Sequence, residues 1–226
     1  MRRLVLALPV VFLALSLDRL SPDRAFPPAG AMVSTWDEVA PTLPGRNEGR
    51  SGLPGDPLNL VFVGRREAVR DALRSAGWTE VPTSVRGSIR AGLREFLAGR
   101  SVAAFPPMHD YRLRGRRQDM NWVLPVRFLQ ERHHFRLWRT GTTDRGGRDF
   151  WWGSANYDRR IRWRDLSHAP DPDVNRERDF VVSTLSRSPR LRALLILPAP
   201  RVPAEGFNDK GYAFRTDGRV AVIDLR

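Results

Sequence analysis

The sequence predicts a single α+β domain with a mixed β-sheet and about three packed helices, preceded by an N-terminal signal or anchor and a flexible tether. Three observations support this fold class. Apolar residues recur at helical spacing in two segments, an Asp-Pro-Asp sequence is typical of the start of a third helix, and apolar or alternating runs predict strands between them. The order of these elements is neither a regular β-α-β alternation nor all β. With 226 residues, 41% of them hydrophobic, the chain is long enough for one such core.

The first residues are typical of an export signal. Met1–Arg3 is basic, and Leu4–Leu17 is an apolar run broken only by Pro9 and Ser16. A helix of that length spans roughly 21 Å, which is less than the ~30 Å hydrocarbon core of a bilayer. Residues 1–20 are therefore predicted to be a signal peptide or a short membrane anchor. This places the chain on the extracytoplasmic face of a bacterial envelope.

Residues 21–56 are predicted to be a flexible linker, because they are rich in Pro, Gly, Ser and Arg and show no periodicity. The folded domain is expected to cover residues 57–226. It opens with a strand at Leu58–Val63, and helices are expected at 65–76 and 84–98. The second helix carries an apolar stripe formed by Val85, Ile89, Leu93 and Leu97.

The middle of the domain is predicted to be rich in strands. Residues 105–125 are polar and are expected to be irregular. Strands are then expected at 126–129, 133–140 and 149–162. The last two are joined by a predicted hairpin loop at Thr142–Gly147, which contains two glycines.

A third helix and three strands complete the domain. The helix is expected from Asp171 to about Ser186, with Asp171 as its N-cap and Pro172 at the first helical position. Strands are predicted at 194–197, 212–215 and 219–225. Thr216-Asp217-Gly218, between the last two, has the composition of a hairpin turn.

The chain has an excess of positive charge, with 38 basic against 25 acidic residues and a net charge of +13. Nearly all the basic residues are arginine, which suits a phosphate, a carboxylate or another anionic partner. The arginines are spread along the chain without a long basic block, so a coding bias explains them equally well. The chain has no cysteine, which excludes disulfides, thiolate metal sites and a cysteine nucleophile.

Residues 131–139 hold two of the four histidines in a run that alternates like a strand. One face of the strand presents an imidazole, a guanidinium and an indole, those of His134, Arg136 and Trp138. The opposite face presents His133, Phe135 and Leu137. Because the first face is costly to bury, we expect it to be exposed and to bind an anion through Arg136 and His134.

A metal or acid–base site is the alternative chemistry. Its candidate residues are His133, His134, Asp158, His168, Asp171, Asp173 and Glu177. Imidazoles and carboxylates are ordinary ligands for zinc or manganese. Against this, adjacent histidines on a regular strand face opposite ways, and no His-Glu-x-x-His spacing occurs. Caps and ion pairs also explain the acidic residues, so the catalytic residues, any metal and any other cofactor stay undetermined.

The order of several motifs resembles the LssY-like C-terminal domain family. The matching blocks are Pro57–Trp78, Tyr111–Asp119, Arg132–Trp138, Trp152–Arg159 and Asp171–Asp179. In some bacterial proteins this domain follows a membrane-embedded phosphatidic-acid-phosphatase-type module. The resemblance implies no particular reaction, and no such module is recognised in this sequence. The chain also departs from the family's His-His-x-Asp-Pro-Asp run, since Ser167–Asp171 contains one histidine.

Three functions are consistent with these observations. The first is an uncharacterised exported or membrane-tethered envelope domain that binds an anionic ligand or an envelope protein and associates with the membrane through residues 1–20. The second is a phosphoester or ester hydrolase, metal-dependent or not, which needs His134, His168 and a carboxylate in one pocket. The third, nucleic-acid binding, requires a cytosolic protein and is not expected for an exported one.

Overall fold

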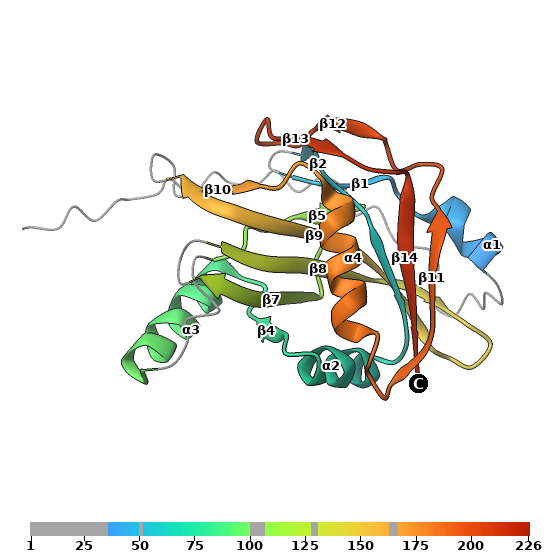
Figure 1. The fold of residues 1–226 in the computed structure, drawn as a ribbon, viewed down its shortest axis with the longest axis horizontal. Helices are drawn as coiled ribbons and strands as arrows, with labels where there is room; N and C mark the ends of the chain where they lie inside the picture. Colours follow the sequence, from blue (N-terminus) through green and yellow to red (C-terminus); the bar gives the residue numbers. More distant parts are fainter. Residues whose placement is uncertain (1–35, 50–51, 100–106, 128–130, 163–166) are drawn as a thin grey trace, which may run out of the picture.

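The computed structural model describes residues 36–49, 52–99, 107–127, 131–162 and 167–226, and these confirm the α+β class with a mixed sheet (Figure 1). The strands of the main sheet are β3 (Leu60–Val63), β4 (Thr79–Val81), β7 (Met120–Arg127), β8 (Glu131–Thr143), β9 (Asp149–Arg162), β10 (Ser167–Pro170), β11 (Leu191–Pro198) and β14 (Arg219–Leu225). Their order is β11-β14-β3-β9-β8-β7-β4, and β10 pairs with the end of β9. Strands β14 and β3 are parallel, whereas β9 is antiparallel to β3, β8 and β10.

Two smaller sheets and the helices surround this sheet. The first small sheet contains β1 (Arg46–Glu48), β2 (Pro54–Pro57), β5 (Arg112–Leu113) and β6 (Arg116–Arg117). The second pairs β12 (Glu205–Phe207) with β13 (Ala213–Arg215). The helical segments are α1 (Trp36–Val39), the 3-10 turn η1 (Ala40–Thr42), α2 (Arg66–Ser75), α3 (Val85–Leu97) and α4 (Val174–Leu185).

The main sheet is buried on both faces because its strands alternate between two apolar clusters. Residues such as Phe62, Phe135 and Trp151 pack with side chains of α2 and α4 on one face, which we call the helix face. Residues such as Val61, Trp138 and Trp152 pack with Val39, Leu43, Tyr111 and Leu113 on the other, which we call the cover face.

The folded part begins earlier than the sequence predicted. Helix α1, strand β1 and all but the last residue of β2 lie within residues 21–56, which were predicted to be a linker. Strand β1 pairs with β2 and with the distant β5, and Leu43 is buried in the cover-face core. Such non-local pairing leaves no periodicity in a short segment, so composition alone gave the wrong boundary.

Residues 1–35, including the predicted signal or anchor, lie outside the described residues. Within the described ranges, no helix has the length and apolar character needed to span a bilayer.

Three local predictions were wrong. Residues 105–125 contain β5, β6 and most of β7, although they were expected to be irregular. The segment at 216–218 is not a hairpin turn, because β13 pairs with β12 while β14 pairs with β11 and β3. Helix α4 is capped by Asp173, whose side chain accepts the Asn175 N–H, and not by Asp171. In contrast, the hairpin that joins β8 and β9 is confirmed.

The apolar stripe of α3 faces away from the sheet. Its residues Ile89, Leu93 and Leu97 are exposed, and the helix instead buries Ser88, Ala91 and Gly92. Small side chains let this face approach the β7 region closely, where Ala91 packs with Val123. Helical spacing thus correctly predicted the helix, but not the face that it buries.

Candidate functional site

The alternation predicted for β8 is confirmed, but the predicted exposure of its polar face is wrong. His134 and Arg136 lie on the cover face and are only 6% and 4% exposed. Trp138 follows them on that face and is fully buried in the apolar cluster rather than in a binding site. The polar face is buried because the first small sheet, which contains β1 and β2, and the loop between β12 and β13 pack over it.

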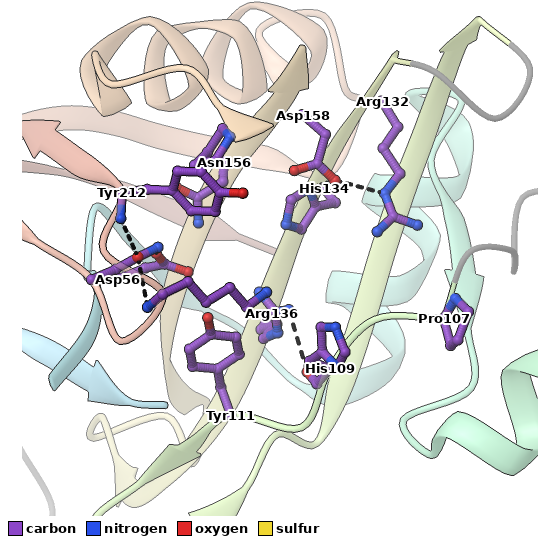
Figure 2. Close-up of a pocket in the computed structure, with 13 residues that line it drawn as sticks. Asp56, Pro107, His109, Tyr111, Arg132, His134, Arg136, Asn156, Asp158 and Tyr212 are labelled. Carbon is purple, nitrogen blue, oxygen red and sulfur yellow. Dashed lines mark hydrogen bonds and ion pairs between the residues drawn. The ribbon is translucent and has the colours of Figure 1, made fainter. Parts of the chain in front are cut away.

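A pocket lies between the cover face and these covering segments (Figure 2). The main sheet contributes Arg132, His134 and Arg136 from β8, and Asn156 and Asp158 from β9. The covering segments contribute Asp56, His109, Tyr111, Lys210 and Tyr212. The cavity has a volume of about 40 Å³, whereas one water needs about 10–15 Å³. The pocket therefore has room for a small group of atoms.

One wall of the pocket is an ion-paired cluster. Arg132 donates through Nε to Asp158 Oδ2 at 2.9 Å, and both side chains are less than a tenth exposed. The Nδ1 atom of His134 lies 3.4 Å from the same carboxylate oxygen. Asp158, a predicted site residue, therefore contacts both His134, which was also predicted, and Arg132, which was not (Figure 2).

Unlike Arg132, Arg136 has buried donor atoms that lack a hydrogen-bond acceptor among the described residues. Its guanidinium lies 4.5 Å from the centre of the Tyr111 ring, and Nη2 donates to the His109 carbonyl at 3.3 Å. The buried Nε and Nη1 atoms have no hydrogen-bond acceptor among the described residues. Burial lowers the pKa of this guanidinium, an effect that Tyr111 and Asp56 oppose. Arg136 thus brings a buried positive charge with two free donors to the pocket.

The covering side adds one carboxylate and one amine. Burial raises the pKa of Asp56, although the charge of Arg136 and a hydrogen bond from Asn208 oppose this. Burial also lowers the pKa of Lys210, and the neighbouring charge of Arg136 lowers it further. The lining thus combines the guanidinium groups of Arg132 and Arg136 and the amine of Lys210 with the carboxyl groups of Asp56 and Asp158.

His133 and Glu177 belong to a different environment, on the helix face. The Nδ1 atom of His133 lies 2.6 Å from Glu177 Oε2. Its ring is stacked between those of Phe180 and Tyr157, at centroid distances of 3.6 and 4.6 Å. The two adjacent histidines therefore do not share a site, as the strand alternation predicted.

The remaining candidates have local roles or are not described. Asp171 accepts the Asp173 N–H and pairs with the exposed Arg176, while Asp173 caps α4 and pairs with Arg215. The backbone of His168 lies in β10, but its side chain is outside the described residues. Among the side chains that the structure describes, no three His, Asp or Glu residues are grouped as metal ligands.

Several lining residues were not predicted from the sequence, namely Asp56, Tyr111, Asn156 and Lys210. Asp56 lies in a stretch whose composition resembles a linker, and Tyr111 lies in one expected to be irregular. Of these four residues, only Lys210 could have been singled out from the sequence, because it is the only lysine among the 38 basic residues.

Glu177→Gln is expected to remove a pH dependence of folding stability. Burial raises the pKa of Glu177 from 4.5 to about 7, although His133 opposes the shift. The folded state therefore keeps a proton that the unfolded chain loses above pH 4.5. This stabilisation is fully present at lower pH and is lost as the pH rises through 7, a change of about 3 kcal/mol.

Urea unfolding of the wild type and Glu177→Gln between pH 4.5 and 8 checks this prediction. The variant should gain about 3 kcal/mol relative to the wild type over that range, because glutamine stays neutral. Glu205→Gln, at an exposed position of β12, is the control and should follow the wild type. A constant difference between Glu177→Gln and the wild type would contradict the prediction.

The sequence model of the family described as LssY C-terminus matches residues 39–220. No curated protein and no solved structure gives a significant match. The matched range includes every pocket residue named above and starts within α1, in agreement with the early start of the fold.

Proposed function

Since the chain belongs to the LssY C-terminus family, whose description names no reaction, we propose that it is an exported or membrane-tethered envelope module that binds a small anion against Arg136. The observation that carries this proposal is the buried guanidinium of Arg136, whose Nε and Nη1 atoms lack an acceptor among the described residues. A buried donor of this kind costs free energy unless a ligand accepts from it.

The surroundings of Arg136 support an anion over a neutral ligand. The Nδ2 atom of Asn156 on β9 is a second buried donor without an acceptor in the described part of the chain. No described carboxylate lies within 4.0 Å of the Arg136 guanidinium, whereas Arg132 has Asp158. A carboxylate or phosphate oxygen offers lone pairs to several such donors at once.

Arg136→Met is expected to weaken anion binding without unfolding the protein. Loss of charge-assisted hydrogen bonds should raise the Kd of phosphate or pyruvate at least about tenfold. The free energy of unfolding should stay within about 1 kcal/mol of the wild type or rise, because a poorly paired buried cation is removed. Calorimetric titration and urea unfolding measure the two effects.

Arg90→Gln is the matched control for net charge. Arg90 is exposed on α3, outside the pocket, and its replacement should leave the Kd unchanged. Equal Kd values for Arg136→Met and the wild type would refute the assignment of the anion to this pocket. A large loss of stability would show instead that Arg136 has a structural role.

The envelope location is the part of the proposal that rests on the sequence. The basic and apolar residues 1–20 support it. Fractionation of a bacterial host that expresses the full chain, with N-terminal sequencing of the product, tests it. Recovery of the full-length chain in the cytosol would overturn this part and leave the anion site untouched.

Hydrolysis of a phosphoester or ester is the second candidate for the same pocket. The contact between His134 and Asp158 favours it, because a carboxylate that orients an imidazole is a common general-base arrangement. Release of nitrophenol from nitrophenyl phosphate and nitrophenyl acetate, compared between the wild type and His134→Asn, tests this candidate. Equal rates for the two proteins would exclude His134 as the base.

A further inference from the structure

Lys210 differs in kind from every other basic side chain of this protein. It is the only lysine of the chain, in which the other residues of the lysine and arginine total are arginine. A guanidinium keeps its charge at any physiological pH, whereas an ammonium can lose a proton and become a nucleophile. The one side-chain amine of the chain lies in the anion pocket.

The loop that carries Lys210 is held in place by its own hydrogen bonds. The side-chain oxygen of Asn208 accepts the N–H groups of Lys210 and Tyr212, both at 3.0 Å. The Nδ2 atom of Asn208 donates to Asp56 Oδ1 at 2.9 Å, which ties the loop to β2. The Nζ atom lies 5.8 Å from the centre of the Tyr111 ring, the same ring that Arg136 faces.

The surroundings of Lys210 favour its neutral form. Burial lowers its pKa, and the positive charge of Arg136 lowers it further, while Asp56, Asp209 and Asp158 oppose the shift. No described carboxylate lies within 4.0 Å of the ammonium group. Burial beside a second cation is a known way to activate a lysine amine.

We infer that Lys210 forms a Schiff base with a small carbonyl compound whose carboxylate is held by Arg136, such as a 2-oxo acid. This inference rests on the proposed anion site. The neutral Nζ attacks the carbonyl carbon, so that a C–N bond forms while the π bond of the carbonyl breaks, and one proton passes from nitrogen to oxygen. The resulting carbinolamine loses its hydroxyl group and the remaining nitrogen proton as water, and a C=N bond forms. One amine and one carbonyl thus give one imine and one water.

Reductive trapping of the full-length protein tests the inference. The protein is incubated with pyruvate and sodium cyanoborohydride at neutral pH, which adds hydride to the imine carbon and leaves a stable carboxyethyl group. Mass spectrometry of the digested protein should find this group on Lys210. The rate should exceed that of a synthetic peptide covering residues 205–215 several-fold, because the lowered pKa of Lys210 raises the fraction of the amine that is neutral.

Two controls separate the amine from the anion site. Lys210→Arg keeps the charge and should abolish the label. Acetone has the carbonyl of pyruvate without its carboxylate, and it should label Lys210 several-fold more slowly. Equal rates with acetone and pyruvate would overturn the assignment of an anionic substrate.

Binding of pyruvate, measured by calorimetry on the wild type without reductant, distinguishes the two proposals. Pyruvate that binds while Lys210 is labelled no faster than in the peptide overturns the Schiff base and leaves the anion site standing. The absence of binding by both phosphate and pyruvate overturns the anion site, and the substrate assignment with it.

Discussion

Asp158→Ala is expected to lower the free energy of unfolding by about 3–5 kcal/mol, one of the two largest effects that we predict. The Asp158 carboxylate is buried, pairs with Arg132 at 2.9 Å and lies 3.4 Å from His134 Nδ1. Its removal leaves Arg132 buried beside Arg136 without that carboxylate, and the lost attraction is not replaced by water. The ion pair thus stabilises the wall of the pocket.

Urea unfolding of three variants checks this prediction. Asp179→Ala removes a carboxylate that is 60% exposed and contacts Arg178, so it should cost less than about 1 kcal/mol. The double variant Asp158→Ala with Arg132→Met should recover much of the loss, because no unpaired charge then remains at this point. A loss in Asp158→Ala no larger than that in Asp179→Ala would show that the pair contributes little.

Phe135→Ala is expected to lower the free energy of unfolding by about 3–5 kcal/mol as well. Phe135 is fully buried on the helix face of β8, where its ring stacks with Phe62 at 6.1 Å and meets the edge of Trp78 at 4.7 Å. Truncation removes these contacts and leaves a cavity where the sheet meets α2 and α4.

Truncation of an exposed phenylalanine, Phe207, is the control. Phe207 is 68% exposed on β12, so Phe207→Ala should change stability by less than about 0.5 kcal/mol. Thermal and urea unfolding of both variants measure the difference. Similar losses in the two variants would contradict the burial of Phe135 and the placement of β8 in the centre of the sheet.

Local patterns predicted a large part of the fold. The period of 3.6 located α2 and α3, the Asp-Pro-Asp sequence located the start of α4, and strand-like runs located β8 and β9 with the hairpin between them. The alternation in β8 also separated His133 from His134 correctly. These predictions succeeded because each depends only on the direction in which neighbouring side chains leave one element.

The same patterns did not show what covers each element. The sequence showed the apolar stripe of α3 but not what it faces, and Leu93 and Leu97 are exposed. Strands β1 and β2 were predicted to be linker, although they pair and pack over the main sheet. Short strands that pair with distant ones depend on their partners, and no window of sequence contains both.

The sequence by itself determined the family, the α+β class and the placement of His134 and Arg136 on one face of a strand, because motif order and residue period are properties of the chain alone. Only the tertiary structure decided that other segments cover and bury this face, and that Asp56, Tyr111 and Lys210 complete a charged pocket with it. These residues come from segments far apart in sequence. They become neighbours only when the small sheets fold over the main one, and that contact buries Arg136 without an ion-pair partner among the described residues.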